Sequence, residues 1–272
     1  MDKDKARLIR HGLSIAILSL LLSLAGAEAF LRWVDPTGAY AYRLSIRAMF
    51  SYIKPDPRGY TFPPGIHDFV GFTVTIDEDG NRIMPDAVSN CRIAWIGDSV
   101  TFGWGVDDRE TFAYQIAEAI PDAQFVNAAR PAYSARNLRL TAESEEADGF
   151  IYIPVFNDNV VAPSWSPEFA PVPLGMDTYL LYGRRGPVRG EAMDWRADLG
   201  AMLSEGDWLT LAINEPSLVL DWLTDSQSDV VIIPNYTERI SQADGHPSAA
   251  GHQGLAVSML SHVEQFVGEV CE

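Results

Sequence analysis

Apolar runs that alternate with helical stretches fill the chain from Cys91 onward, and this alternation constrains the fold more than any other feature. The apolar runs are CRIAWIG, QFVNAA, GFIYIPVF and VVIIPN, and TFAYQIAEAI is a helical stretch between the first two. Short continuous apolar runs are typical of strands covered on both faces, and strands that alternate with helices form parallel sheets. The sequence therefore predicts a three-layer α/β/α sandwich with a parallel sheet over residues 91–272.

Other parts of this region are less regular. Helices are expected at 137–146, 191–203 and 248–267, where the polar or apolar pattern has helical spacing. The Pro-rich piece at 163–190 has no clear periodicity and is expected to form a surface excursion near the mouth of the sheet. The segment DWLTLAINEPSLVLDWL has no clear assignment.

The N-terminus is basic and then strongly apolar. MDKDKARLIRH precedes GLSIAILSLLLSLAGAEAFL, in which Glu28 is the only charged residue. About 20 apolar residues are needed to cross a bilayer, and the basic flank favours a cytoplasmic N-terminus. A cleaved signal peptide is the alternative, because AGA and AEA within residues 25–29 have the small-x-small spacing of a cleavage site. A buried core helix is a third interpretation. We expect a cytoplasmic tail and transmembrane anchor (or signal peptide) over 1–34, with the remainder periplasmic or extracellular.

Residues 35–90 are rich in proline, glycine and aromatic residues. The alternation in FTVTI, followed by DGN, predicts a small hairpin. DEDGN lacks the acid spacing and the terminal glutamate of an EF-hand, so a turn is favoured over a metal site. We expect a lead-in segment that packs on the main domain and spaces it from the membrane.

Charge and cysteine content exclude some function classes. The formal net charge of the 272 residues is -17, which would repel nucleic-acid phosphates. Neither Cys91 nor Cys271 has a partner at metal-ligand spacing, so no zinc site is expected, and no cofactor is expected either. Cys91 opens the first strand and Cys271 follows a final helix antiparallel to it. A disulfide at that edge of the sheet and two unpaired thiols both remain open.

Polar residues follow the apolar runs, at the strand ends where ligands gather in open parallel sheets. They are GDS at 97–99, NAARPAYS at 127–134, NDN at 157–159 and DGH at 244–246. Ser99 is either a nucleophile or a helix N-cap, and His246 is either its base or a surface histidine. A serine nucleophile needs a base, and the base needs an orienting acid, for which Asp244 is the candidate.

These residues resemble the motifs of the SGNH hydrolases, also called the GDSL esterases, over about residues 91–268. GDS matches the first family block with Ser99 as nucleophile, VFND at 155–158 keeps Asn157, and DGHPSAAGH matches the fifth block with His246 as base. The resemblance implies a flavodoxin-like sheet and a Ser-His-Asp esterase or acyltransferase. It also implies that the amides of Ser99 and Ala132 and the side chain of Asn157 hold the oxyanion.

Three positions depart from the family pattern. Ala132 stands where the family has the glycine of NxGxPGYS, and an alanine there would strain a backbone with positive φ. Val155 replaces the glycine of the third block, which removes space beside Asn157. The family acid commonly lies three residues before the histidine, where this chain has Ala243, so Asp244 at minus two is the candidate acid.

The expected function is an anchored extracytoplasmic serine esterase that hydrolyses or transfers O-acyl groups, such as acetyl esters on a carbohydrate, and touches the membrane through its N-terminal helix. One alternative is a catalytically silent binding protein that kept the fold. Another is a lipase or thioesterase, which needs an apolar channel or lid. Trp104, Trp165, Tyr179 and Tyr182 could stack on sugar rings, with ordinary packing as the competing interpretation.

Overall fold

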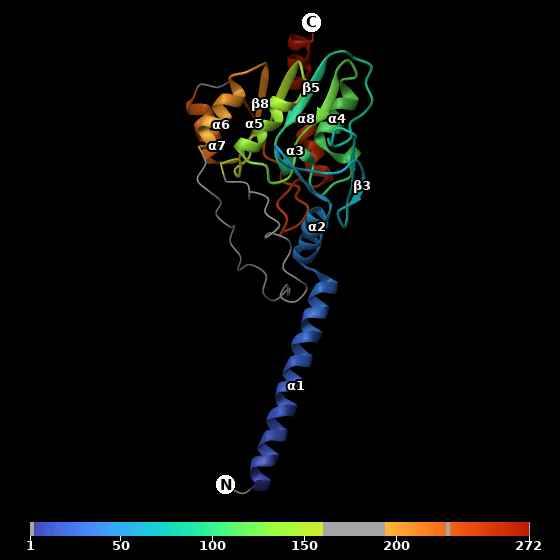
Figure 1. The fold of residues 1–272 in the computed structure, drawn as a ribbon, viewed down its shortest axis with the longest axis vertical. Helices are drawn as coiled ribbons and strands as arrows, with labels where there is room; N and C mark the ends of the chain where they lie inside the picture. Colours follow the sequence, from blue (N-terminus) through green and yellow to red (C-terminus); the bar gives the residue numbers. More distant parts are fainter. Residues whose placement is uncertain (1–2, 160–193, 227–228, 272) are drawn as a thin grey trace.

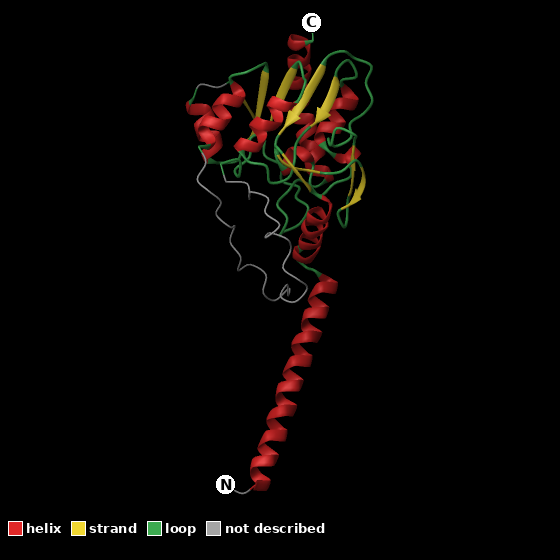
Figure 2. Ribbon diagram, in the orientation of Figure 1, coloured by secondary structure: helices red, strands yellow, loops and turns green. Residues whose placement is uncertain are grey.

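The computed structural model describes residues 3–159, 194–226 and 229–271. Its centre is a five-stranded sheet with the order β6-β5-β7-β8-β9, in which every pairing is parallel (Figure 1, Figure 2). The strands are β5 (Arg92–Ile96), β6 (Gln124–Asn127), β7 (Gly149–Tyr152), β8 (Trp208–Ile213) and β9 (Val230–Ile233). The predicted parallel sheet of the three-layer sandwich is confirmed.

Helices cover both faces of the sheet, because the side chains of each strand point alternately to opposite sides. Ile93 and Trp95 of β5 belong to a core shared with helices α4 and α8, whereas Ala94 and Ile96 belong to a core shared with α5, α6 and α7. The bounds are α4 (Phe112–Ala119), α5 (Ala135–Ser144), α6 (Trp195–Leu203), α7 (Leu218–Asp225) and α8 (Ala249–Val270).

The segment that the sequence left unassigned forms β8 and α7. Ser217 begins the helix, since its hydroxyl accepts a hydrogen bond from the amide of Leu220 at 3.1 Å. The expected helix at 191–203 is observed from Trp195 onward. The expected surface excursion at 163–190 lies outside the described residues.

Two helices precede the sheet domain. Helix α1 (Lys3–Val34) projects away from it, and α2 (Ala39–Tyr52) lies between α1 and the domain (Figure 1). Within Arg10–Val34 an 18-residue window reaches a mean hydropathy of 2.0, and none of that window is buried in the protein. Length and composition therefore allow α1 to cross a membrane or to act as a signal sequence, and its exposure excludes the interpretation as a core helix.

The lead-in segment forms two small antiparallel pairs. Strands β1 (Lys54–Asp56) and β2 (Gly59–Thr61) form the first pair, and β3 (Gly65–Asp68) and β4 (Thr73–Ile76) the second. The FTVTI strand is thus present as β4, but its main partner precedes it, so the hairpin turns at 69–72. Across the DGN turn only a single bridge forms, between Ile76 and Arg82.

Aromatic residues fasten the lead-in segment to the sheet domain. Phe62 packs on Phe102 with ring centroids 5.6 Å apart, and both Phe69 and Phe72 contact Trp104, at 5.9 and 5.2 Å. All five side chains are buried. The lead-in segment therefore supports the short stretch that follows β5, where the sequence predicts the active site.

The two cysteines form a disulfide, which resolves the alternative left open by the sequence. Cys91 and Cys271 have a Cα–Cα distance of 5.6 Å, within the range usual for disulfides. The bridge ties the start of β5 to the end of α8 and closes the amino edge of the sheet, at the C-terminal end of the molecule in Figure 1.

Candidate active site

The turn after β5 presents Ser99 at the carboxyl edge of the sheet. A Cβ atom at Gly97 would lie 2.0 Å from Oγ1 of Thr101, so the turn is too tight there for any other residue. The N-cap of helix α3 (Ser99–Phe102) is Asp98, whose Oδ1 accepts from the amide of Val100 at 2.9 Å. The interpretation of Ser99 as the cap is therefore wrong, because the preceding aspartate fills that role and leaves the serine hydroxyl available.

The structure brings Ser99, His246 and Asp244 together. The Nε2 atom of His246 lies 2.8 Å from Oγ of Ser99, and Nδ1 lies 2.5 Å from Oδ1 of Asp244. Since a carboxylate accepts, Nδ1 donates, and in the neutral imidazole Nε2 then accepts the serine proton. Oδ2 of Asp98 is a second acceptor, 3.1 Å from the same hydroxyl, so the shorter contact is to the imidazole.

Trp104 holds the second oxygen of the acid. Its indole Nε1 donates to Oδ2 of Asp244 at 3.3 Å, and its ring centroid lies 6.1 Å from that of His246. The side chain is 2% exposed, so it supports the acid and offers no open face for a sugar ring. Trp165, Tyr179 and Tyr182, the other aromatic residues considered for stacking, lie outside the described residues.

The loop that contains Asp244 and His246 is fixed by hydrogen bonds from both sides. The amide of Asp244 donates to Oγ of Ser241 at 3.0 Å, and the hydroxyl of Tyr236 donates to the carbonyl of Gly245 at 3.0 Å. Burial, and then the negative charge of Glu215, raise the pKa of Tyr236 to about 12. The phenol therefore keeps its proton, and this bond, at neutral pH.

Ser99, Ala132 and Asn157 line one cleft, and each has a hydrogen-bond donor that is not paired with a described residue. The backbone amides of Ser99 and Ala132 and the side-chain amide of Asn157 donate to no acceptor among the described residues. Ala132 has φ of 60°, the left-handed backbone expected for the family's glycine. The strain that the sequence predicts at this alanine is therefore present, and Ala132 lines the same cleft as Ser99.

Asp158 holds the loop of Asn157 in place through hydrogen bonds. Its Oδ2 accepts from the hydroxyl of Tyr152 at 2.6 Å and from the amide of Val155 at 3.0 Å. Its carbonyl accepts from the amide of Ala135 at 3.0 Å, which ties this loop to the start of α5. Burial, followed by the charge of Asp98, raises the pKa of the Asp158 carboxyl well above its usual range.

These groups line a cleft of about 550 Å³, a volume typical of small-molecule sites. Its wall includes two sets of residues that the sequence did not indicate. Glu215 and Tyr236 follow β8 and β9, and the apolar face of α2 contributes Tyr42, Ile46, Met49 and Phe50. Glu215 was missed because β8 itself was not recognised, since residues that follow a strand at this edge are the usual candidates.

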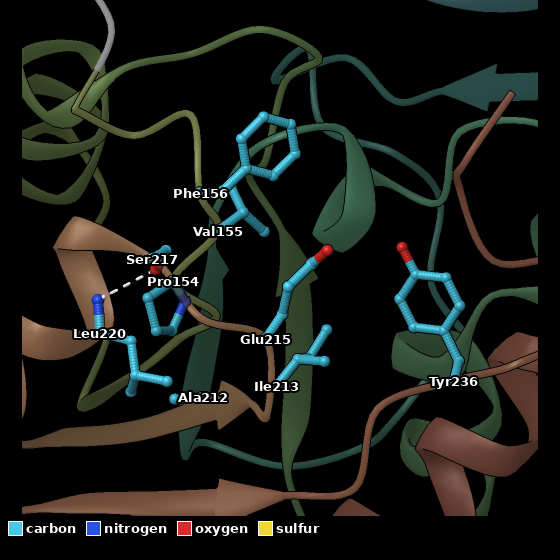
Figure 3. Close-up of a pocket in the computed structure, with 9 residues that line it drawn as sticks. All are labelled: Pro154, Val155, Phe156, Ala212, Ile213, Glu215, Ser217, Leu220 and Tyr236. Atoms are coloured by element: carbon cyan, nitrogen blue, oxygen red, sulfur yellow. Dashed lines mark hydrogen bonds between the residues drawn. The ribbon is translucent and has the colours of Figure 1, made fainter.

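A smaller cavity of about 20 Å³ adjoins this cleft and shares Phe156, Glu215 and Tyr236 with it. Figure 3 shows the carboxylate of Glu215 and the hydroxyl of Tyr236 pointing to the same side of the cavity, with Phe156 on a neighbouring loop. This volume suffices for a water molecule and not for a substrate group. Within the described ranges, no cluster of three or more His, Cys, Asp or Glu side chains is placed to hold a metal ion.

Comparisons with known proteins give matches among solved structures. No family model and no curated protein matches the chain. Among solved structures, a family two carbohydrate esterase from Cellvibrio japonicus is 16% identical, with a TM-score of 0.42 over 72% of this chain and 66% of the other. The chain thus spans just under two thirds of that neighbour.

Two further neighbours have similar scores. An acetyl xylan esterase from the rumen bacterium Butyrivibrio proteoclasticus is 14% identical, with a TM-score of 0.40 over 70% of this chain and 68% of the other. A lipolytic protein of the G-D-S-L family from Veillonella parvula is 12% identical, with a TM-score of 0.41 over 64% and 97%. At such identities and TM-scores, these neighbours transfer no activity or substrate to this chain.

Proposed function

We propose that this protein is a serine esterase that hydrolyses or transfers O-acyl groups, with an acetylated carbohydrate as the candidate substrate. The observation that supports it most is the continuous chain of contacts from Ser99 through His246 to Asp244, at 2.8 and 2.5 Å. A serine hydroxyl is a weak nucleophile unless an oriented base takes its proton, and this arrangement supplies both base and orientation.

The chemistry follows from the positions of the three groups. Oγ of Ser99 attacks the ester carbonyl while Nε2 of His246 takes the hydroxyl proton, and Asp244 stabilises the resulting imidazolium. Negative charge then develops on the carbonyl oxygen, where the amides of Ser99 and Ala132 and the side chain of Asn157 donate. The tetrahedral species collapses as His246 protonates the leaving alkoxide, and an acyl enzyme forms on Ser99.

The second half of the reaction reverses these roles. Water, or a hydroxyl of an acceptor, loses its proton to His246 and attacks the acyl enzyme, and the proton then returns to Oγ of Ser99. Either nucleophile gives a balanced reaction, so the same site serves as hydrolase or as acyltransferase. No step requires a metal or a cofactor.

The apolar N-terminal helix and the disulfide indicate an extracytoplasmic location, because disulfides persist in oxidising compartments. Within that setting we assign residues 1–34 to a tail and transmembrane anchor, 35–90 to the lead-in segment and 91–272 to the catalytic domain. Exposure of apolar side chains such as Leu13 and Leu22, at 60% and 65%, supports a lipid environment for α1.

The decisive test is hydrolysis of p-nitrophenyl acetate by the full chain in detergent micelles, beside Ser99→Ala and His246→Ala. Loss of either group removes the nucleophile or its base, so we expect kcat to fall by about 10⁴-fold or more. Ser89→Ala is the matched control, because the Ser89 hydroxyl lies at the other edge of the sheet and donates to the carbonyl of Asp122.

Labelling of Ser99 by a fluorophosphonate provides an independent readout in the same preparation. If the folded parent neither hydrolyses the ester nor reacts with the probe, the chain is a silent binding protein that kept the fold. Activity that survives in Ser99→Ala would equally contradict the mechanism.

A further inference from the structure

The cleft around Ser99 has walls of two kinds. Helix α2 contributes Tyr42, Ile46, Met49 and Phe50, which lie on one helical face because they are spaced four, three and one residue apart. Ile46 and Phe50 are half-buried, so this face is partly open to the cleft.

The loops after β8 and β9 contribute polar groups to the same cleft, namely Glu215, Tyr236 and Arg239. A molecule that fills the cleft thus meets an apolar helix face as well as charged and hydroxyl groups. Both sets line the same cleft as Ser99.

The apolar wall follows directly from the candidate membrane helix. Val34 ends α1, and Thr37, three residues later, accepts a hydrogen bond at its carbonyl from the amide of Ala243 at 3.0 Å. A Cβ atom at Gly38, where φ is 71°, would lie 2.5 Å from the side chain of Ser241. The joint between α1 and α2 is therefore packed on the loop that contains Asp244 and His246.

This packing fixes the distance between the catalytic groups and the end of the candidate span. Three residues of extended chain cover at most about 10 Å, so the loop of His246 is held close to the end of α1. The strand arrows in Figure 2 also point toward the end of the molecule at which α2 and α1 lie. The carboxyl edge of the sheet, and the cleft with it, thus faces the end of the molecule at which the candidate membrane helix α1 lies (Figure 2).

From this geometry we infer that the substrate is an O-acylated membrane amphiphile, such as a glycolipid or a lipid-linked sugar, and not a free soluble polymer. Its apolar part lies against Ile46 and Phe50 of α2, and its hydroxylated head lies toward Glu215 and Tyr236. The inference rests on the proposed esterase function and adds the class of molecule that carries the ester. Burial of an apolar tail against this wall would lower the free energy of binding, a gain that a substrate without such a tail would make only through its sugar rings.

The test uses the full chain in phosphatidylcholine vesicles and two substrates with the same ester, 6-O-acetyl dodecyl glucoside and 6-O-acetyl methyl glucoside. Loss of the acetyl ester, followed by mass spectrometry, counts hydrolysis and transfer alike. We expect kcat/KM for the dodecyl substrate to exceed that for the methyl substrate by at least about tenfold, a difference of about 1.4 kcal/mol.

Variants of α2 distinguish two causes of a dodecyl preference. One is contact between the alkyl chain and α2, and the other is accumulation of the dodecyl substrate in the vesicle membrane. Ile46→Gln should reduce the dodecyl preference several-fold, whereas Ile46→Met should keep it, because the wall stays apolar. Ile66→Gln is the matched control, since Ile66 is 75% exposed on β3 and does not line the cleft.

Different results would overturn the two proposals. Equal kcat/KM for both glucosides, or a preference that Ile46→Gln leaves intact, would overturn the assignment of a membrane amphiphile bound on α2, while hydrolysis of p-nitrophenyl acetate would leave the esterase function standing. Inactivity toward all three esters would remove both proposals together.

Discussion

The two edges of the sheet differ in how they are built. At the amino edge, the disulfide between Cys91 and Cys271 joins the start of β5 to the end of α8. At the carboxyl edge, the chain holds Ala132 in a left-handed conformation and leaves a cleft beside Ser99. Strained backbone and open polar groups lower stability, and they persist only where the surrounding structure determines them. Stabilising and reactive features therefore occupy opposite ends of the same strands.

The largest expected effect on stability lies at the amino edge. The bridge spans 180 residues, for which the chain-entropy model gives about 5 kcal/mol, at the upper end of the usual 2–5 kcal/mol. The double variant Cys91→Ser, Cys271→Ser should lose this much free energy of unfolding in urea titrations. Its kcat per folded molecule should stay at the parent level, and a large fall in kcat would show that the two edges are coupled.

The next effect lies at the carboxyl edge and concerns activity. Asn157→Ala removes a donor to the developing oxyanion and should lower kcat by about 10²–10³-fold, with little change in the free energy of unfolding. Asn214→Ala is the control, because Asn214 also follows a strand at this edge but does not line the cleft. Equal kcat values for the two variants would exclude Asn157 from the oxyanion site.

Helix α8 joins the two edges, and its first turns contain a histidine that makes the fold sensitive to acid. Burial, followed by the charges of Arg82 and His246, lowers the pKa of His252 to about 3. Nδ1 of this ring accepts from the amide of Phe112 at 3.2 Å.

The direction of this pH dependence follows from the protonation of His252 in the folded and unfolded chains. Below about pH 6.5 the unfolded chain binds a proton at this ring and the folded chain does not, so stability falls as pH falls toward 3, by about 1.4 kcal/mol per pH unit. Between pH 6.5 and 4.5 the loss is therefore roughly 2–3 kcal/mol. In His252→Asn the side-chain oxygen can still accept from Phe112, and this part of the pH dependence should disappear from urea titrations. An unchanged slope would mean that the ring is protonated in the folded state.

The smallest effect concerns the strained alanine. A non-glycine residue in the left-handed region costs about 1–2 kcal/mol, and glycine gives back part of that through its freer unfolded chain, so Ala132→Gly should stabilise the fold by about 1 kcal/mol. Thermal unfolding should show a rise in Tm of a few degrees. A lower Tm would contradict the strain inferred from the φ of 60°.

Much of the architecture could be predicted from local sequence patterns. Each of β5, β6, β7 and β9 contains consecutive apolar residues, and the pattern is clearest in β5, β6 and β7 because most of their residues are buried. Strand β8 escaped because WLTLAI and LVLDWL are separated only by NEPS, and short adjacent apolar runs do not reveal their period. Because β8 was not recognised in the sequence, Glu215, which follows this strand, was not identified as a candidate residue.

The candidate site likewise contains residues that local patterns predict and contacts that they do not. Ser99 and His246 are 147 residues apart, yet their motifs lie at strand ends that a parallel sheet must bring to one edge. The contact of Trp104 with Asp244 had no such local signal, because an indole donor finds its acceptor only after the chain has folded.

By itself, the sequence determined the parallel sheet, the apolar N-terminal helix and the strand ends at which Ser99, Asn157 and His246 lie. Each of these features depends on a local pattern of residues close together in the chain. Only the tertiary structure decided that Cys91 meets Cys271 and that α2 forms a wall of the catalytic cleft. The reason is physical: hydrophobic periodicity is a local property, whereas the separation of groups distant in the chain is fixed by the packing of all the layers together.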